Sequence, residues 1–204
     1  MSIKLFKAFF IITLLYGNIC DASEIAAVLG YSNATNNELW QQKQIGFGVK
    51  NLLQQAILDN TDFSLLDEKI ILGISNEAIE TQLQAHWMLN ENQTTSDNLK
   101  AIAKKNNLNH IFWVKVTDFV SRTTKFSLAF FNSSGYKDTL TLEVCHYSIT
   151  TNTTECQEGE ATQSRTLTGV LYKPTENVNF SESGAGRLSQ EAINQSLAKL
   201  LHHE

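Results

Sequence analysis

The chain has 204 residues, of which 42% are hydrophobic and 18% charged, a balance typical of a globular domain with a real core and unlike that of a disordered chain. Its formal net charge of -5 argues against a nucleic-acid partner, because nucleic-acid-binding proteins carry a basic surface that attracts phosphates. The single proline, Pro174, leaves no proline-rich linker, so we expect residues 23–204 to form a single domain.

The first 22 residues have the pattern of a secretory signal peptide. A basic start with two lysines precedes an apolar run at residues 8–16, and the small residues Cys20 and Ala22 stand at positions -3 and -1 of a cut before Ser23. A membrane anchor is the alternative, but the run is shorter than the roughly 20 residues that a helical span needs. We therefore expect export to the periplasm, with outer-membrane association left open and no helical membrane span.

The cysteines carry two further expectations. Cys20 also allows a lipoprotein, in which the lipidated cysteine directly follows the cut, although the residues before it fit that pattern badly. If the cut follows residue 22, the mature chain keeps Cys145 and Cys156, and two cysteines in an exported chain usually form a disulfide. Two free buried thiols are the alternative. Zinc is disfavoured because ten residues separate this pair and only His146 stands near it, and we expect no cofactor.

The N-terminal part of the mature chain predicts one βαβ unit. An apolar run at residues 25–31 predicts a strand covered on both faces, residues 40–60 predict an amphipathic helix, and residues 63–67 predict a second strand. Gly46 and Gly48 lie inside the helical pattern. Because glycine costs a helix about 1 kcal/mol relative to alanine, we expect these two residues to allow close packing against a neighbour. A helix that starts only near residue 49 is the alternative. The apolar face of the pattern comprises Ile45, Val49, Leu52, Leu53, Ala56 and Ile57.

Two more helices should follow. Ser75 is a plausible N-cap for a helix at residues 76–90, and Thr95 or Ser96 for a second helix that ends at residues 106–107. Leu99, Ile102 and Ala103 would face inward from the second helix, and the cluster of Lys100, Lys104 and Lys105 reads as its solvated face.

The pattern then changes to period two. Apolar and other side chains alternate over residues 110–120 and again over residues 138–149, which is typical of antiparallel strands with one buried face. Residues 150–154 predict a turn, and pairing of the two cysteines would centre that hairpin between Thr150 and Thr151.

The C-terminal part predicts a further strand at residues 162–171, a long loop at residues 173–186 and a closing helix capped by Ser189. The apolar face of this helix comprises Ala192, Ile193, Leu197, Leu200 and Leu201. The whole pattern predicts an α/β fold: a mixed sheet with an N-terminal βαβ unit, antiparallel C-terminal strands and a closing C-terminal helix.

No group of residues stands out as catalytic, so we expect a protein that is not an enzyme. None of His86, His110, His146, His202 and His203 has a carboxylate or nucleophile at a spacing that suggests a triad, although a fold can bring distant residues together. Residues 46–48 lack the later glycine or lysine of a phosphate-binding loop. Asp67 and Glu68 follow the second strand, where α/β proteins often place functional carboxylates, but a cap or turn role is the better interpretation. A hydrolase with a dispersed site is a rival hypothesis.

The order of elements resembles the family of the curli secretion channel CsgG and the peptidoglycan-synthase activator LpoB. The stretch IAAVLGYSNAT leads into a helix containing IGFGVKNLL, then DFSLLDE, two helices, the strand NHIFWVKVTDF and a closing LSQEAINQSLAKLL helix. The resemblance covers about residues 25–201. It implies a non-enzymatic envelope protein, usually a lipoprotein, that oligomerises or binds other envelope proteins.

The resemblance also raises the question of membrane insertion. Pore-forming relatives insert two hairpins per subunit, and the corresponding stretches would be residues 121–144 and 160–182. The second stretch is too polar for this, so we expect sheet strands outside the membrane. We therefore expect a cell-envelope assembly or scaffold protein; the alternatives are an oligomeric outer-membrane secretion channel subunit and a periplasmic activator of a cell-wall synthase.

Overall fold

The computed structural model describes residues 23–67, 70–71, 89, 94–128, 131–166, 171–172 and 179–202, with side chains described outside residues 126–133. Several predictions lie outside the described residues: the signal peptide at 1–22, the helix at 76–90 with its cap Ser75, and the side chains of Glu68, His86 and His203.

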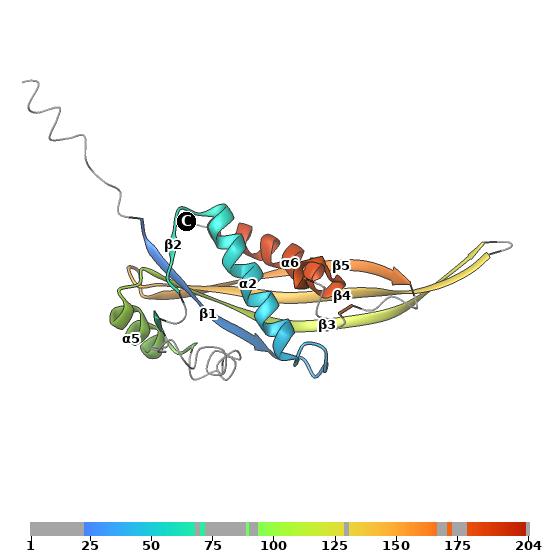
Figure 1. The fold of residues 1–204 in the computed structure, drawn as a ribbon, viewed down its shortest axis with the longest axis horizontal. Helices are drawn as coiled ribbons and strands as arrows, with labels where there is room; N and C mark the ends of the chain where they lie inside the picture. The colour runs from blue at the N-terminus through green and yellow to red at the C-terminus, as the bar shows by residue number, and fades with distance from the viewer. Residues whose placement is uncertain are drawn as a thin grey trace, which may run out of the picture.

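A five-stranded sheet forms the framework, with its strands in the order β2-β1-β3-β4-β5 (Figure 1). β1 pairs in parallel with β2 and β3, whereas β4 is antiparallel to both β3 and β5. The predicted mixed sheet, N-terminal βαβ unit, antiparallel C-terminal strands and closing helix are confirmed. The strands are β1 (Ile25–Asn33), β2 (Ser64–Leu65), β3 (His110–Leu128), β4 (Phe131–Ser148) and β5 (Thr153–Thr166).

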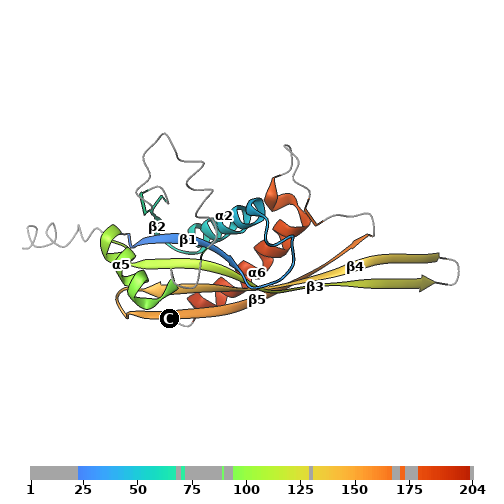
Figure 2. The same cartoon turned by 90° about the horizontal axis from the view of Figure 1, so that it is seen from below.

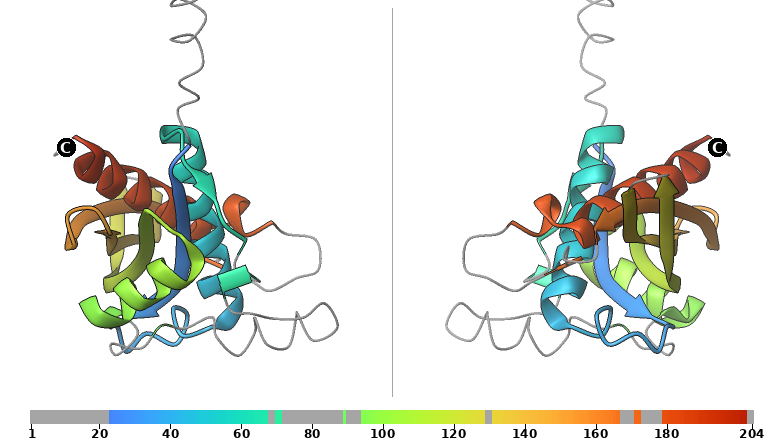
Figure 3. Two further views of the ribbon diagram at one scale, coloured as in Figure 1. Left: turned by 90° about the vertical axis from the view of Figure 1, so that its left-hand side faces the viewer. Right: turned by 90° about the vertical axis from the view of Figure 1, so that its right-hand side faces the viewer.

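Helices cover the two faces of the sheet unequally. α2 (Lys43–Asn60) and α6 (Gly184–Leu201) pack together on one face. The shorter α5 (Ser96–Asn106) packs on the opposite face, near the start of β3. Figure 2 shows α5 at one end of the molecule, and Figure 3 views the layers from the two ends.

α2 begins at Lys43, so the alternative of a late helix start is wrong and both predicted glycines lie inside the helix. A Cβ atom added at Gly48 would lie only 2.2 Å from the Phe180 ring, which belongs to the short helix η2 (Phe180–Glu182). The predicted close packing against a neighbour is therefore confirmed for Gly48, and the neighbour is this chain's own C-terminal segment.

α5 matches its prediction closely. Leu99 and Ala103 are buried, and the helix ends at Asn107, whose positive φ of 56° is a left-handed conformation that asparagine tolerates. The three lysines of the predicted solvated face are all exposed.

The closing helix starts earlier than predicted. Its cap is Ser183, whose Oγ accepts a hydrogen bond from the Gly186 N–H at 2.9 Å. Ser189 is not the cap: it lies inside α6, buried, and its hydroxyl donates to the Ala185 carbonyl at 2.8 Å. The first turn of α6 holds two glycines, which are poor helix formers and make this turn look like a loop in the sequence. Close contacts with η2 and Leu171 require them here.

The two serines give a testable contrast. Replacing Ser183 with alanine should lower the free energy of unfolding by about 1 kcal/mol, because an orphan N–H of the first turn loses its partner. The Ser189→Ala control keeps every helix N–H bonded and should cost less. Urea unfolding of both variants would measure this, and a larger loss for Ser189→Ala would contradict the assignment of the cap.

Both faces of the sheet are buried where β3 begins, so the prediction of a single buried face is wrong for this segment. Phe112 and Val114 pack toward α2 and α6, whereas Ile111 and Trp113 pack toward α5. β3 is central, between β1 and β4, and both helical layers reach its start. β4 follows the prediction as far as Val144, because Leu140, Leu142 and Val144 are fully buried and Thr141 and Glu143 are less buried. Toward its end both faces are buried, because Cys145 and Tyr147 pack toward α5.

β3 and β4 continue past the end of β1 as a ribbon, which we define as residues 117–128 and 131–141 (Figures 1 and 2). β5 accompanies the ribbon as far as Gly135↔Thr166, and beyond that pair the described ribbon has two strands. Their pairing runs from His110↔Ser148 to Leu128↔Phe131, with one irregularity between Val116 and Asp118. The separate strand predicted at residues 162–171 is wrong in part, because residues 162–166 are the end of β5.

Candidate functional site

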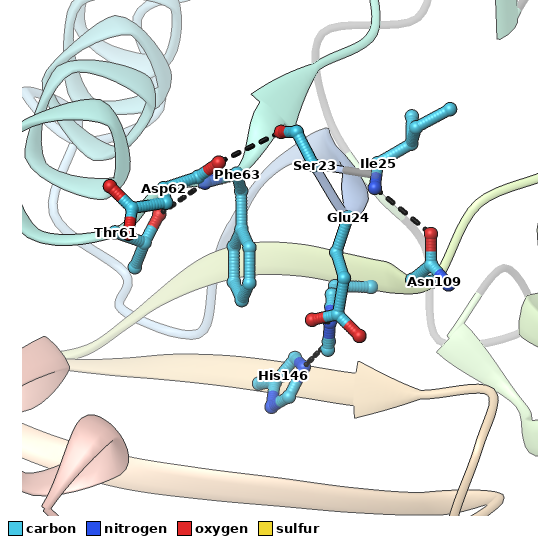
Figure 4. Close-up of polar contacts among 9 residues, drawn as sticks. Ser23, Glu24, Ile25, Thr61, Asp62, Phe63, Asn109 and His146 are labelled. Carbon is cyan, nitrogen blue, oxygen red and sulfur yellow. Dashed lines mark hydrogen bonds and ion pairs between the residues drawn. The ribbon is translucent and has the colours of Figure 1, made fainter. Parts of the chain in front are cut away.

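A chain of three polar side chains lies at the end of the sheet where the described chain begins. Glu24 Oε2 lies 2.8 Å from His110 Nε2, and His110 Nδ1 lies 2.8 Å from His146 Nε2. These side chains come from three separate segments, just before β1, at the start of β3 and near the end of β4. Figure 4 shows Glu24 and His146 at this end of the sheet.

Aromatic rings hold this Glu24–His110–His146 chain in place. The Phe63 ring stacks on His110 with centroids 4.3 Å apart, and Phe112 stacks on His146 at 4.6 Å. His110 is only 7% exposed, whereas Glu24 is largely exposed. The imidazoles are therefore shielded, and the carboxylate connects them to solvent.

The environment keeps His146 neutral at ordinary pH. Burial lowers the pKa of His146 to about 4, the neighbouring His110 lowers it further in the same direction, and the Glu24 carboxylate opposes the shift.

The same region fastens the start of the chain. Ser23 Oγ donates to the Asp62 carbonyl at 2.8 Å, and the Ile25 N–H donates to Asn109 Oδ1 at 2.9 Å (Figure 4). The residues that directly follow the predicted cut are thus bonded to the sheet and to the loop before β2. In the contacts described, the Glu24–His110–His146 chain positions the N-terminal strand.

Sequence reasoning missed this cluster. His110 is 86 residues from Glu24 and 36 from His146, and no local spacing links them. In retrospect, the usable signal was that His110 begins one predicted strand and His146 lies near the end of another, so antiparallel pairing brings the two side chains to the same end of the sheet.

Cys145 and Cys156 form a disulfide across β4 and β5. They face each other directly in the register, and the turn lies between the paired residues Ser148 and Thr153. The residue pairs flanking the turn agree with a hairpin centred between Thr150 and Thr151. Cys145 is buried and Cys156 is exposed.

The other candidate residues have local roles. Asp67 lies in a turn, where its carbonyl accepts from the Ile70 N–H at 2.9 Å, and its charge partly offsets the burial that lowers the pKa of Lys50 to about 8. His202 is exposed at the end of α6. In the described ranges no three His, Cys, Asp or Glu side chains are grouped so that they could hold a metal ion, and no helix is long and apolar enough to cross a membrane.

The outer edge of β3 is the other candidate site. β1 accompanies β3 only as far as Asn33↔Val116, with one further bond from the Ala34 N–H to the Val116 carbonyl. Beyond Val116, no strand of the described chain pairs with the outer side of β3, which runs on to Leu128. This outer edge is therefore a row of backbone donors and acceptors open to another chain.

A buried ion pair stiffens the base of the ribbon. Asp138 is fully buried, and its carboxylate accepts from Arg165 Nε at 2.6 Å and from Ser121 Oγ at 2.5 Å. The Arg165 guanidinium also lies over the Tyr136 ring, 4.2 Å from its centroid. These contacts join β3, β4 and β5 where β5 ends.

Comparisons with known proteins give only distant matches. No family model and no curated protein match the chain. Among solved structures, the fold is similar to the hypothetical protein CT253 from Chlamydia trachomatis, with 13% identity, a TM-score of 0.49 and coverage of 88% of this chain and 96% of that one.

Two further structures are similar at low identity. The LpoB C-terminal domain from Escherichia coli has 15% identity and a TM-score of 0.43, and the match covers 76% of this chain and 93% of that one. PelC from Paraburkholderia phytofirmans, solved as a dodecamer, has 8% identity and a TM-score of 0.43, with 86% of each chain covered.

Proposed function

We propose that this chain is a non-enzymatic assembly or scaffold protein of the bacterial cell envelope that acts through protein–protein contacts. Export is supported by the basic, apolar and small-residue pattern of residues 1–22. The role in assembly is supported by the resemblance of residues 25–201 to the CsgG and LpoB family.

The unpaired outer edge of β3 in the ribbon carries this proposal. β3 has 19 residues and β4 has 18, so the paired strands extend over about 60 Å at 3.4 Å per residue. Natural proteins usually keep edge strands short or cover them, because an open edge invites pairing with another chain. A long edge held out beyond the body is suited to accepting a strand from a partner.

The register identifies the residues whose backbone groups point outward. The Val144 N–H points to the β5 side, where it donates to Ser196 Oγ. The β4 residues of the other parity, such as Lys137 and Thr139, therefore direct their backbone N–H and C=O groups toward β3. Their partners on β3 are Arg122 and Val120. We infer that the intervening ribbon residues Ser121, Thr123 and Lys125 direct their N–H groups outward. The Phe119 N–H already donates to Asp118 Oδ1 at 2.8 Å.

A photocrosslinking experiment tests this edge. The full chain, with a photoreactive residue at Thr123, is expressed in a bacterial host, exported and illuminated in the intact envelope. We expect adducts with envelope protein at Thr123, lost in Lys125→Pro, because proline removes an outward donor that a pairing strand needs. An adduct of the chain with itself would favour an oligomer, and an adduct with another envelope protein would favour an activator.

Two controls make the result specific. Lys125→Ala removes the same side chain but keeps the N–H, and should retain the adducts. A probe at Asn194, exposed on α6, reports random collisions. The proposal fails if the Thr123 and Asn194 probes give the same adducts, or if Lys125→Pro leaves the Thr123 pattern unchanged.

A further inference from the structure

A second surface, on the face of the sheet opposite α2 and α6, carries charges that are sorted by sign along the strands. We call it the open face and define it as the outward side chains of residues 115–122, 137–143 and 158–162. Arg122 and Lys137 lie at its ribbon end; Glu143 and Glu158 lie at the end nearer α5, with Asp118 and Glu160 between.

The open face places like charges directly opposite one another twice. Arg122 pairs with Lys137 across β3 and β4, and Glu143 pairs with Glu158 across β4 and β5. Like charges in directly opposed positions of a sheet destabilise it. In the described sheet, Lys115 is the one opposite charge that the register places directly across from a member of either pair, at Glu143.

These charges are available for an outside partner. Arg122, Lys137 and Glu158 are exposed, and no salt bridge is formed by any charged residue of the open face in the described chain. Between the two like-charge pairs lies a hollow of about 300 Å³ that Val120, Thr139 and Thr141 help to line. Among the described residues, α5 packs near the start of β3, in a cluster with Ile111, Trp113, Cys145 and Tyr147, none of which belongs to the open face.

We infer that the occupant of the open face is a second copy of this chain. The basic pair and the acidic pair are separated along β4 by the stretch from Lys137 to Glu143, about 20 Å at 3.4 Å per residue. A two-fold axis near the Thr139–Thr141 midpoint reverses the strand direction of the second copy. It brings the basic end of each copy over the acidic end of the other.

Such a pattern is self-complementary, which is what an isologous two-fold interface requires. It relieves both like-charge pairs at once, and it suppresses wrong registers, in which like charges would meet. The inference rests on the proposed function, since it names the chain itself as one partner in assembly. It uses a different surface from the outer edge of β3.

Charge reversal with cross-rescue tests the pairing. The exported protein is purified from cells expressing the full chain, and its mass is measured by sedimentation at low and high salt. The wild type should dimerise at low salt and dissociate at high salt, because exposed charges are screened. R122E/K137E alone and E143K/E158K alone should each weaken self-association at least about tenfold, because like charges then face each other.

Mixing the two variants should restore the dimer mass, because an acidic face then meets a basic face. The matched control reverses Lys100 and Lys125, which are exposed but lie off the open face, and should dimerise like the wild type. Circular dichroism of each variant verifies that it is folded before mixing.

A wild type that stays monomeric at low salt, or two folded variants whose mixture remains monomeric, would overturn the inference. The two proposals then separate cleanly. A monomer that still gives Lys125→Pro-sensitive adducts at Thr123 leaves the proposed function standing. A dimer that gives no specific envelope adduct at Thr123 supports pairing through the open face and contradicts the proposed role of the β3 edge.

Discussion

Replacing Gly159 with alanine adds one methyl group and should lower the free energy of unfolding by about 3 kcal/mol. A Cβ at residue 159 of β5 would lie 1.9 Å from the Ala192 carbonyl oxygen and 3.0 Å from the Ser196 nitrogen. Both atoms belong to the backbone of α6, so no side-chain rotation relieves the contact and the helix must move away from the sheet.

Moving α6 also breaks a bridge within the sheet. Ser196 Oγ accepts from the Val144 N–H at 3.0 Å and donates to the Gln157 carbonyl, and Val144 and Gln157 face each other across β4 and β5. A loss of about 3 kcal/mol corresponds to a fall in melting temperature of roughly 6–12 °C for a chain of this size.

Thermal unfolding followed by circular dichroism measures the effect. Ser164→Ala is the matched control, because it changes one exposed residue of the same strand and should alter stability by less than about 0.5 kcal/mol. Equal melting temperatures for Gly159→Ala and the control would mean that α6 does not pack against β5 as closely as described.

The second large effect is a loss of stability in acid that depends on His146. Its pKa is about 4 in the folded protein and about 6.5 in the unfolded chain, so the unfolded chain binds more protons between these values. Stability from the neutral His146 is therefore fully present above about pH 6.5 and is lost as the pH falls toward 4, by about 2–3 kcal/mol in total.

Replacing His146 with glutamine isolates the contribution that His146 protonation makes to stability. Glutamine keeps a polar partner for His110 but does not titrate, so the free energy of unfolding should vary less between pH 6.5 and 4 than in the wild type. His202→Gln, at the exposed end of α6, should keep the wild-type slope. Urea unfolding at a series of pH values measures these slopes, and parallel wild-type and His146→Gln curves would show that His146 is not the group responsible.

The sequence was informative wherever periodicity decides the structure. The spacing of Ile45, Val49 and Leu53 predicted α2, and the alternation of Leu140, Leu142 and Val144 predicted β4, because burial follows these periods directly. The positions of the two cysteines also predicted the centre of the hairpin, because one directly opposed pair fixes every other pair between two antiparallel strands.

Boundaries and long-range contacts were less predictable. The start of α6 at Gly184 depends on contacts of its glycines with Phe180, Leu171 and Gln163, which no local pattern reveals. The Glu24–His110–His146 chain and the buried Asp138–Arg165 pair each join residues that are at least 27 positions apart in the sequence. The length of the ribbon was missed because the polar residues 121–125 are exposed on both faces and show no alternation.

Amide hydrogen exchange resolved to single residues shows whether a partner strand pairs with the outer edge of β3. Exchange is compared between the isolated exported protein and the same protein in its native envelope assembly. We expect the outward amides of Ser121, Thr123 and Lys125 to exchange quickly in isolation and to become protected in the assembly, while Val120 and Arg122 change little. Outward amides that exchange equally fast in both samples would mean that no strand pairs with this edge in the envelope.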